Sequence, residues 1–231
     1  MNNHAEKTSN IVDEVITTRR AVRSFLPRSV PRDEIRSILE VAGRAPSGTN
    51  MQPWKVYVVG KPKIGEIYTA IMDSGIKPER AIWDDYQYYP KRFVEPYLAR
   101  RRSLGTALYD LIGIEKRDTK GMRDQFNRNF NFFDAPLGLF VTIDRHLEVG
   151  SWFDLGMFTQ NILIAAQSRG LATCPQAAFA PFHRQIRPLI GMPDKEILVC
   201  GIAIGYEDSE KPENSLRTER ASVDQWAHFI E

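Results

Sequence analysis

The stretch that decides the fold is AGRAPSGTNMQPWKVYVV, residues 42–59, in which a loop of small, turn-forming and amide residues runs directly into a strand. The strand itself, WKVYVVG over residues 54–60, is rich in β-branched and aromatic side chains and closes on a glycine, as buried strands do. The loop before the strand contains Ser47, Gly48 and Asn50. These residues offer more groups that can bind a polar ligand than a simple turn requires. The stretch therefore predicts a sheet whose entry loop is a candidate binding element.

Bulk composition limits the class of protein. The chain has 231 residues, 42% of them hydrophobic, which is enough for one well-packed domain, so we expect a single domain over residues 1–231. The formal net charge of +2 demands neither a nucleic acid nor a membrane as partner. The polar N-terminus and the lack of a long apolar run lead us to expect a cytoplasmic protein.

The cysteine and histidine pattern argues against a metal centre. The two cysteines have no CxxC spacing, and the four histidines are scattered along the chain. Neither a zinc site nor a disulfide framework is indicated, and we expect no bound metal.

Further regular elements can be placed from periodicity. The segments LGLFVTID, residues 137–144, and ILVCGIAIGY, residues 197–206, are expected strands. Residues 152–169 are apolar on most sides and stop at Gly170, which predicts a helix buried by neighbours on several faces. Few strands between long helical stretches, without a βαβ repeat, indicate an α+β domain, and no GxGxxG follows a strand as a Rossmann fold would require.

Shorter helices are expected near both ends. Apolar residues at helical spacing mark one over residues 11–16 and another over residues 35–42, the latter opened by Pro31 in its first turn. Near the C-terminus, Ser222 and Gln225 form a possible capping box before apolar residues at helical spacing. We expect an amphipathic helix there that packs on another surface, such as a second subunit.

Residues 73–130 differ in composition from the rest of the chain, because aromatic and charged residues are mixed there without the periodic pattern of a buried core. This segment is either a helical elaboration that lies over a site or a peripheral hairpin that contacts no ligand. Within it, residues 91–128 hold ten Lys and Arg against five acidic residues. That local excess either attracts a small anion or forms the solvated face of helices.

Three arginines follow the first helix, at positions 19, 20 and 23. Arginine forks bind phosphate bidentately, although cations also complement the negative end of a helix. Arg217 and Arg220 raise the same two alternatives near the C-terminus. Cys174 is interpreted as a buried, inert cysteine, because a nucleophile would need a contacting base and His183 lies nine residues away across two prolines.

Taken together, the chain resembles the FMN-dependent nitroreductase family. The resemblance depends on three blocks in the family's order: TTRRAVRSF through APSGTNMQPWKVYVV, then FFDAPLGLFVTIDR through GLATCPQAAF, then GMPDKEILVCGIAIGYED with LRTER. It implies a nitroreductase-like α+β fold, a central mostly antiparallel sheet flanked by helices, with residues 73–130 as a helical lid insertion. It also implies a homodimer whose two FMN sites are built from both chains.

The resemblance assigns the cofactor site residue by residue. The arginines after the first helix and the two near the C-terminus are placed near the FMN phosphate, the 46–50 loop reaches the flavin from the partner subunit, and CPQA lies beside the ring. The family often has serine where this chain has alanine at position 21, and the register of Asn129 against the family is loose. The residues so assigned are Arg19, Arg20, Ala21, Arg23, Pro46, Ser47, Gly48, Asn50, Asn129, Pro175, Gln176, Ala177, Arg217 and Arg220.

The implied activity is a two-electron ping-pong transfer from NADPH or NADH, through flavin N5, to a nitroaromatic compound or a quinone. No side chain then needs to act as nucleophile, so no catalytic residue is assigned. Tyr88, Tyr89 and Phe126 of the lid are the expected substrate contacts. The basic residues of the lid would favour a carboxylated nitroaromatic or the extra phosphate of NADPH.

Two alternatives stay open at this point. The same scaffold could serve a reductive dehalogenase or a flavin-dependent oxidase, since such relatives differ mainly in the lid. The chain could also be a non-catalytic flavin-binding protein, or a nucleic-acid-binding protein that uses ARRRS, residues 99–103.

Overall fold

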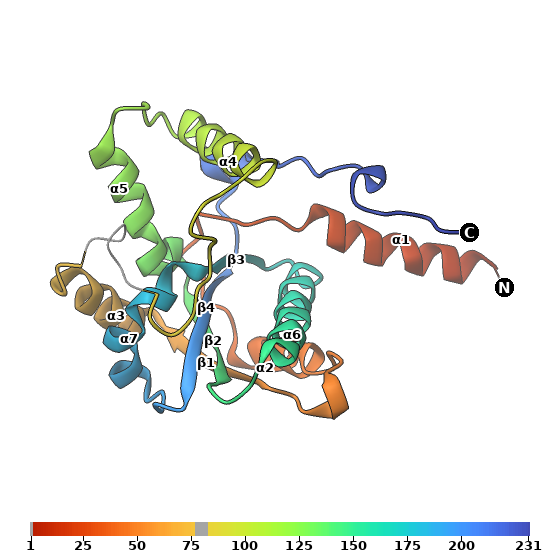
Figure 1. Ribbon diagram of the computed structural model, residues 1–231, viewed down its shortest axis with the longest axis horizontal. Coiled ribbons are helices and arrows are strands. Elements are labelled where there is room, and N and C mark those ends of the chain that lie inside the picture. The colour runs from red at the N-terminus through yellow and green to blue at the C-terminus, as the bar shows by residue number, and fades with distance from the viewer. Residues whose placement is uncertain (1, 77–82) are drawn as a thin grey trace.

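A computed structural model describes residues 2–76 and 83–231. Its centre is a four-stranded sheet in the order β1-β2-β4-β3, in which each neighbouring pair is antiparallel (Figure 1). The predicted α+β class and the antiparallel sheet are confirmed. The strands are β1 (Trp54–Gly60), β2 (Leu137–Asp144), β3 (Ala172–Gln176) and β4 (Glu196–Gly205).

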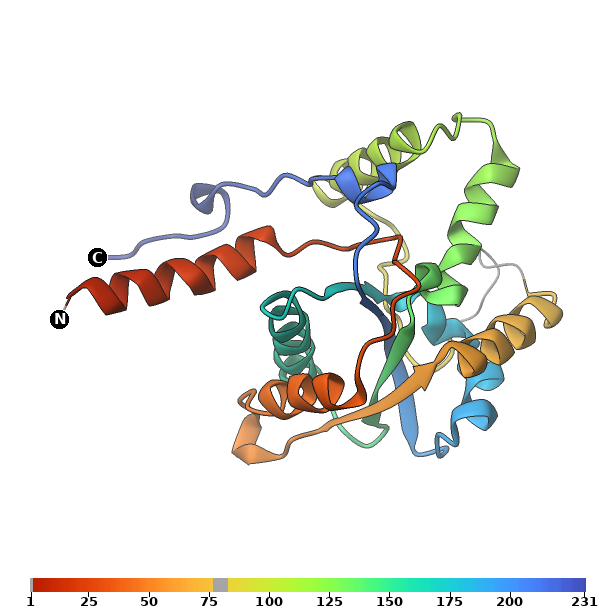
Figure 2. The same cartoon turned by 180° about the vertical axis from the view of Figure 1, so that it is seen from behind.

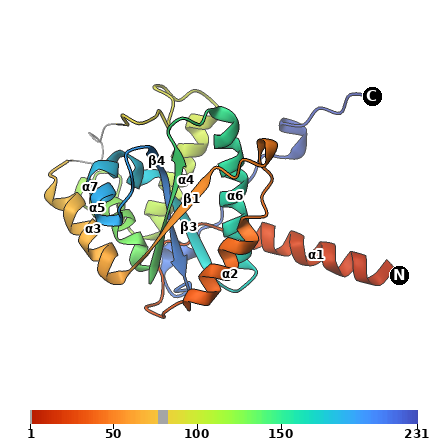
Figure 3. The same ribbon diagram turned by 90° about the horizontal axis from the view of Figure 1, so that it is seen from below.

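One face of the sheet is covered by α2 (Arg32–Ala42) and α6 (Val149–Gln167) (Figure 3). Ile38 of α2 and Ile162 of α6 are fully buried in the same core as Leu139 of β2. The predicted burial of α6 along its length is confirmed for its middle turns, where Phe158 stacks on Trp54 with ring centroids 4.7 Å apart. Pro31 precedes α2 as its N-cap residue rather than lying inside its first turn.

The other face is covered by α3 (Lys61–Asp73), α7 (His183–Ile190) and two 3-10 segments, η3 (Arg128–Asp134) and η4 (Ala177–Phe182). Phe132 stacks on Phe179 at 4.5 Å between centroids. Each ring lies directly over a glycine of the sheet. A Cβ at Gly201 would come within 2.5 Å of Phe179, and a Cβ at Gly138 would come within 2.5 Å of Phe132. These two glycines let the aromatic layer approach the strands closely.

Most of the predicted 73–130 insertion lies outside these layers. It contains α4 (Tyr97–Leu111) and α5 (Thr119–Asn127), preceded by residues 83–96, which we call the aromatic strap. Residues 77–82 of this predicted insertion lie outside the described part of the chain. In Figure 1 the strap runs from α4 down in front of β3 and β4. A role as lid stays a prediction.

The two ends of the chain project from the body in the same general direction (Figures 1 and 2). The first is α1 (Asn2–Thr18), on which Ile11, Val12 and Ile16 are exposed. Among residues 2–76 and 83–231, none of the helices has both the length and the hydropathy that crossing a bilayer requires.

The predicted C-terminal amphipathic helix is wrong for the single chain. Only a 3-10 turn, η6 (Val223–Gln225), forms, and Ser222 makes no capping bond. Trp226 is 66% exposed and Phe229 is 84% exposed. A short amphipathic helix depends on a surface that buries its apolar face, and the described residues of this chain leave Trp226 and Phe229 uncovered.

A buried carboxylate ties three strands together at the end of the sheet. The Glu196 side chain, 4% exposed, accepts hydrogen bonds from Tyr57 at 2.9 Å and Thr142 at 2.6 Å, and Lys55 Nζ lies 3.1 Å away. Burial alone would raise the pKa of Glu196, but the bonds from Thr142, Lys55 and Tyr57 outweigh it and hold the pKa below its usual range.

Replacing Glu196 by glutamine is therefore expected to lower the free energy of unfolding by about 2 kcal/mol at neutral pH. The deficit should shrink as pH falls through the lowered pKa of Glu196, because the wild type then loses the same charge. Chemical denaturation from about pH 7 down to about pH 3, which extends below the ordinary glutamate pKa of about 4.3, measures it. Lys55→Met is the control, with a loss below about 1 kcal/mol because Lys55 is 41% exposed. A deficit that stays constant with pH would contradict this account.

Candidate functional site

The arginine segment after α1 lies along the outer edge of β3. Ala21 forms a parallel bridge with Thr173, and the Val22 N–H donates to the Thr173 carbonyl at 3.0 Å. Phe25 then bridges to Glu207 beyond β4. The predicted cluster at positions 19, 20 and 23 is therefore held beside an edge strand by backbone pairing.

Cations from both ends of the chain meet at this edge. The pKa of Arg19 is lowered, first by burial and then by the positive charge of Arg220, while Cys174 acts in the opposite direction. Within the described residues, neither arginine has an ion pair with a carboxylate; Arg220 bonds only to Thr218 and the Glu219 carbonyl. Like charges gathered without a carboxylate partner are a favourable site for an anion.

Asn214 fastens the C-terminal segment to the arginine segment. It is 3% exposed, accepts the Arg23 N–H at 2.8 Å, and donates to the carbonyls of Ser24 at 2.9 Å and Asp208 at 2.8 Å. Its own carbonyl accepts from Arg217 at 2.9 Å. One buried amide thus fixes the two stretches that carry the predicted phosphate ligands.

The arginines differ in how far they are already engaged. Arg20 forms an ion pair with Glu207, and its Nε donates to the Asn214 carbonyl at 3.2 Å. The Arg23 guanidinium donates, among the described residues, only to the Ala21 carbonyl, at 3.3 Å. Arg19, Arg23 and Arg220 are the better candidates for an anion, and Arg20 has a structural role that its position in the motif did not reveal.

The predicted ring-edge residues lie three positions further along β3. The Gln176 amide nitrogen donates to the backbone carbonyl of Asn129 at 2.8 Å and lies 3.2 Å from its side-chain oxygen. Gln176 is 3% exposed, and its buried Oε1 has no hydrogen-bond partner among residues 2–76 and 83–231. Pro175 is exposed at the strand edge, where its missing N–H costs nothing, and Ala177 begins η4.

An orphaned buried acceptor is unusual and calls for a donor. From Thr173 to Gln176 the strand advances about 10 Å. The anion site and this unsatisfied acceptor are therefore placed along one edge, at a spacing that suits an elongated ligand with a phosphate at one end and a hydrogen-bonding ring at the other.

The 46–52 loop is held in a strained conformation. The Gly48 N–H donates to Asp154 of α6 at 3.1 Å, and the Gln52 N–H donates to the Ser47 hydroxyl at 3.0 Å. Thr49, Asn50 and Gln52 have φ of 49°, 60° and 49°, in the left-handed region that costs a non-glycine residue free energy. Such strain clusters at functional sites. Gly48 and Asn50 are exposed, and so is Pro46.

In one chain the loop and the arginine segment lie at opposite ends of α6. The loop contacts Asp154 in the first turns, whereas Gln167 at the last turn donates to Thr18 at 3.3 Å, directly before the arginines. The stretch from Asp154 to Gln167 spans about 20 Å at about 1.5 Å per residue. The sequence-predicted site residues thus form two groups that a single chain does not bring together.

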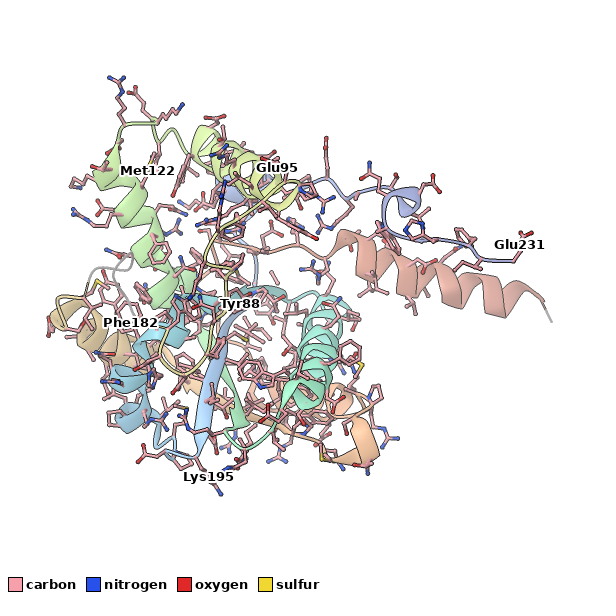
Figure 4. The ribbon with its side chains drawn as sticks, in the orientation of Figure 1. Tyr88, Glu95, Met122, Phe182, Lys195 and Glu231 are labelled. Carbon is pink, nitrogen blue, oxygen red and sulfur yellow. The ribbon has the colours of Figure 1, made fainter. Side chains whose placement is uncertain are left out.

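The predicted substrate contacts lie near the end of β3. Tyr88, labelled in Figure 4, is on the strap. Burial raises its pKa, as do Tyr89 and Cys200, and Cys200 adjoins the residue paired with Gln176. Tyr88 and Tyr89 pack edge to face at 4.6 Å between ring centroids, and both are 46% exposed. Phe126 of α5 is 38% exposed, and its carbonyl accepts from the Asn129 amide at 2.8 Å.

The interpretation of Cys174 as inert is confirmed. It is 3% exposed, and burial raises the pKa of its thiol to about 11 although Arg23 and Arg19 act to lower it. His183 does not serve it as base, because the imidazole Nε2 lies 2.8 Å from Asp84.

A cavity of about 710 Å³ lies elsewhere, between α2 and the exposed edge of β1. Ile35, Leu39 and Val58 line it, and none of the predicted cofactor residues does. Because β1 and β3 are opposite edges of the sheet, this cavity is separate from the arginine edge.

Sequence reasoning missed the residues that organise the site. Asn214, Asp154 and Glu207 position the arginines and the loop without belonging to a recognisable motif. Asp154 had one local signal, since it is a carboxylate within a strongly apolar helix. Asn214 had none, because the partners that join it to the arginine segment, Arg23 and Ser24, lie about 190 residues away in the sequence.

The comparisons with known proteins agree with one another. The nitroreductase family model matches residues 16–206. The chain is 39% identical over 224 residues to 4-nitrobenzoate reductase from Nocardioides sp. strain LMS-CY, which covers 94% of this chain and 89% of that protein.

Solved structures give the same result. The crystal structure of the FMN and NADPH-dependent nitroreductase NfnB from Sphigopyxis sp. strain HMH matches with a TM-score of 0.89 and 34% identity, over 95% of this chain and 99% of that one. NfnB from Mycobacterium smegmatis, in complex with NADPH, matches with a TM-score of 0.90 and 29% identity, over 97% of this chain and 100% of that one.

Asn214→Ala should lower the free energy of unfolding by about 2 kcal/mol, because the Arg23 N–H loses its acceptor and the carbonyls of Ser24 and Asp208 each lose one of two donors. Denaturant titration followed by circular dichroism measures the loss. The matched control is the neighbouring Ser215→Ala, exposed and bonded only to Pro212, which should stay within about 0.5 kcal/mol of wild type. Equal effects of the two substitutions would show that Asn214 does not fasten the segments.

Proposed function

This chain belongs to the nitroreductase family, and we propose that it uses FMN to pass two electrons from NADPH or NADH to nitroaromatic compounds. One observation carries the proposal. Arginines from both ends of the chain gather without carboxylate partners beside β3, and the same strand ends at the orphaned buried acceptor of Gln176. This edge suits a phosphate-bearing, hydrogen-bonding cofactor.

The residues present fit FMN. Arg19, Arg23 and Arg220 would hold the phosphate dianion through charge-assisted hydrogen bonds. The Gln176 Oε1 would accept a hydrogen bond from a ring N–H and so satisfy its buried oxygen. Pro175 and Ala177 adjoin it at the exposed strand edge, where a flat ring can lie against backbone.

When bound, FMN supplies the hydride chemistry, and the protein binds, orients and tunes it. No side chain is needed as a nucleophile. The cations at the β3 edge also favour a more negative, reduced ligand, which is an electrostatic contribution. Tyr88, Tyr89 and Phe126 offer flat apolar surfaces for the nicotinamide and for the nitroaromatic compound that replaces it. Quinones fit the same surfaces.

We further propose that the working form is a homodimer in which the 46–50 loop of one chain reaches the cofactor held by the arginines of the other. Three observations support it: the loop and the arginines of one chain lie about 20 Å apart along α6, the loop is strained and exposed, and both ends of the chain carry uncovered apolar residues. On α6 itself, Phe153 is 70% exposed and Val149 is 82% exposed.

The alternatives are less well supported. An iodotyrosine deiodinase also matches most of this chain, but it is only 23% identical, whereas 4-nitrobenzoate reductase is 39% identical, which favours nitro reduction over dehalogenation. Within α4, Arg101 lies over Phe93, with the guanidinium carbon 4.6 Å from the ring centroid. This arginine of ARRRS is engaged by an aromatic ring, which weakens the nucleic-acid alternative.

Purified protein is expected to be yellow and to release FMN on denaturation. Under anaerobic conditions NADPH or NADH should bleach the bound flavin, and a nitroarene should restore the colour, because the two reactants take turns at one site. Absorbance near the flavin maximum measures both steps. A halophenol and a quinone run in parallel identify the competing acceptors. Protein that binds no FMN on reconstitution, or flavin that NAD(P)H does not bleach, would contradict the proposal.

Complementation tests the shared site. Asn50→Ala and Arg19→Met should each lower FMN retention and turnover by at least about tenfold as homodimers, since each damages both sites. Co-expressed heterodimers of the two variants should recover up to half of wild-type turnover, because one site then has neither defect. Purification through two different affinity tags isolates the heterodimer.

The same experiment has a clear contrary outcome. If one chain supplied both groups, each heterodimer site would carry one defect, and activity would stay at the level of the variants. A monomeric wild type in analytical ultracentrifugation would also contradict the dimer, whatever its activity.

A further inference from the structure

A buried ion pair joins the base of the predicted lid to the C-terminal segment. Arg128, at the start of η3, donates from Nη1 to Glu213 at 2.6 Å. Glu213 belongs to the short helix η5 (Pro212–Ser215), which lies beside α4 (Figures 1 and 2). The Glu213 side chain is 6% exposed, and a buried carboxylate depends on its cation. The pair therefore fixes η3 relative to η5.

The Arg128 guanidinium is already bonded within the lid base. Nη1 also donates to Gln125 Oε1 at 3.3 Å, and Nη2 lies 3.5 Å from Asp134 Oδ2. Two carboxylates thus balance its charge, whereas Arg19 and Arg220 pair with none among the described residues. Arg128 therefore belongs to the frame of the site and not to its anion-binding arginines.

The neighbours of both partners face the predicted cofactor edge. Asn214, which follows Glu213, is bonded to the arginine segment. Asn129, which follows Arg128, accepts from the Gln176 amide at 2.8 Å through its backbone carbonyl. Because the arginine segment itself runs along β3, these contacts form a closed ring that includes both ends of the cofactor edge and the lid base.

The part of the lid that this ring of contacts holds has little apolar core. The structure describes α5 in full, and none of its side chains is buried. In η3, φ is positive at Phe132, Phe133 and Asp134, a conformation that costs a non-glycine residue free energy. A cavity of about 580 Å³, lined by both members of the ion pair, lies between α5 and η5. Polar bonds therefore contribute more than apolar packing to the position of α5.

The end of α5 carries one of the predicted substrate contacts. Phe126 is 38% exposed and lies two residues before Arg128. Its carbonyl accepts from the Asn129 amide at 2.8 Å, and its ring packs edge to face on Phe130 at 5.8 Å between centroids. A displacement of η3 would therefore move Phe126 with it.

We propose that Arg128 is a positioning residue: through its ion pair with Glu213 it couples the cofactor edge to the lid, so that the occupied edge holds Phe126 in place for the aromatic substrate. The inference rests on the proposed function, because it takes the β3 edge as the cofactor site and Phe126 as a surface for the nitroarene. Arg128 acts through the lid base and touches neither cofactor nor substrate.

The coupling has a consequence for each ligand. FMN should restrain the arginine segment and η5, and the ion pair should pass this restraint to η3 and α5. Backbone amides of α5 should then exchange more slowly in the FMN-loaded protein than in the FMN-free protein. Loss of the pair should raise the KM for a nitroarene and change kcat little, because the cofactor edge itself stays intact.

A double substitution tests this coupling. Arg128→Met alone would leave Glu213 buried without a cation and destabilise the fold, so the test variant combines Arg128→Met with Glu213→Gln. The matched control combines Lys120→Met with Asp124→Asn, which removes an exposed ion pair of 2.7 Å from α5. Arg128→Lys keeps a cation opposite Glu213 and serves as the conservative variant.

Hydrogen exchange with and without FMN separates the coupling from cofactor binding. In the wild type, FMN should slow exchange at residues 21–25 and, by about tenfold, in α5. In the double variant, residues 21–25 should keep this protection while α5 loses it, and the control pair and Arg128→Lys should behave as wild type. A wild type that binds no FMN would contradict the proposed function. FMN that protects residues 21–25 of the wild type but not α5 would overturn the coupling alone.

Kinetics with nitrobenzene, which has no charge for the variants to attract or repel, test the substrate side. KM should be about tenfold higher in the double variant, as if Phe126 were in place a tenth of the time, with kcat and FMN content close to wild type. A merely structural role would lower FMN content or leave the KM of the folded variant unchanged. A double variant with the KM of the wild type, or with no larger a change than the control pair, would overturn the proposal.

Discussion

The rest of the site depends on the pairing of an extended segment with the open edge of β3. Sheet edges expose unpaired backbone groups, and this protein covers part of one edge with residues 21–25, so that three arginines become fixed points of the sheet rather than a flexible sequel to α1. Asn214 then draws the C-terminal segment to the same edge. Backbone and amide hydrogen bonds hold the arginines close together before any ligand binds. The free-energy cost of bringing these like charges together is therefore met during folding and takes little from the binding energy of the ligand. Their positions are set by folding.

The geometry of α6 keeps the 46–52 loop and the arginine segment of one chain apart. A helix of 19 residues holds its two ends about 28 Å apart, and this chain fastens the strained loop to one end and the arginine segment to the other. The loop's left-handed residues are stabilised by Asp154 and Ser47 without any ligand from the same chain. Backbone strain in an exposed loop is difficult to explain by the folding of one chain alone. The proposed second copy of the chain, which would receive the loop, accounts for this strain. It also accounts for the exposed apolar residues at both ends of the chain.

Local patterns predicted the strands well, because a run of β-branched residues that ends at a turn residue is itself the sequence signal of a buried strand. They also drew attention to the arginine motif, whereas the cofactor roles of that motif and of the CPQ stretch came from the family resemblance and stay predictions. Asn214 could not be found, since its bonds close a loop of about 190 residues and asparagine near a turn is unremarkable in sequence. The left-handed turn at Phe132 and Phe133 was equally hidden, because tertiary packing of the two rings outweighs the intrinsic preference of phenylalanine. The C-terminal helix was predicted wrongly for a related reason: the pattern describes a face that needs a partner surface, and the single chain provides none.

Three of the six buried side-chain atoms that lack a hydrogen-bond partner among the described residues belong to Gln176, His183 and Asp85. Gln176 Oε1 lies on the cofactor side, and His183 Nδ1 and Asp85 Oδ2 lie under the strap. Folding normally leaves few such atoms, because each costs free energy in a low-dielectric interior. The first group lacks a donor that a ring ligand can supply, whereas the atoms of the second face each other across 3.5 Å where the strap meets α7. The strap is held there by bonds to His183, Arg184 and Arg145 that involve none of the predicted cofactor residues. Contacts that hold the strap are therefore distinct from those that hold the cofactor edge.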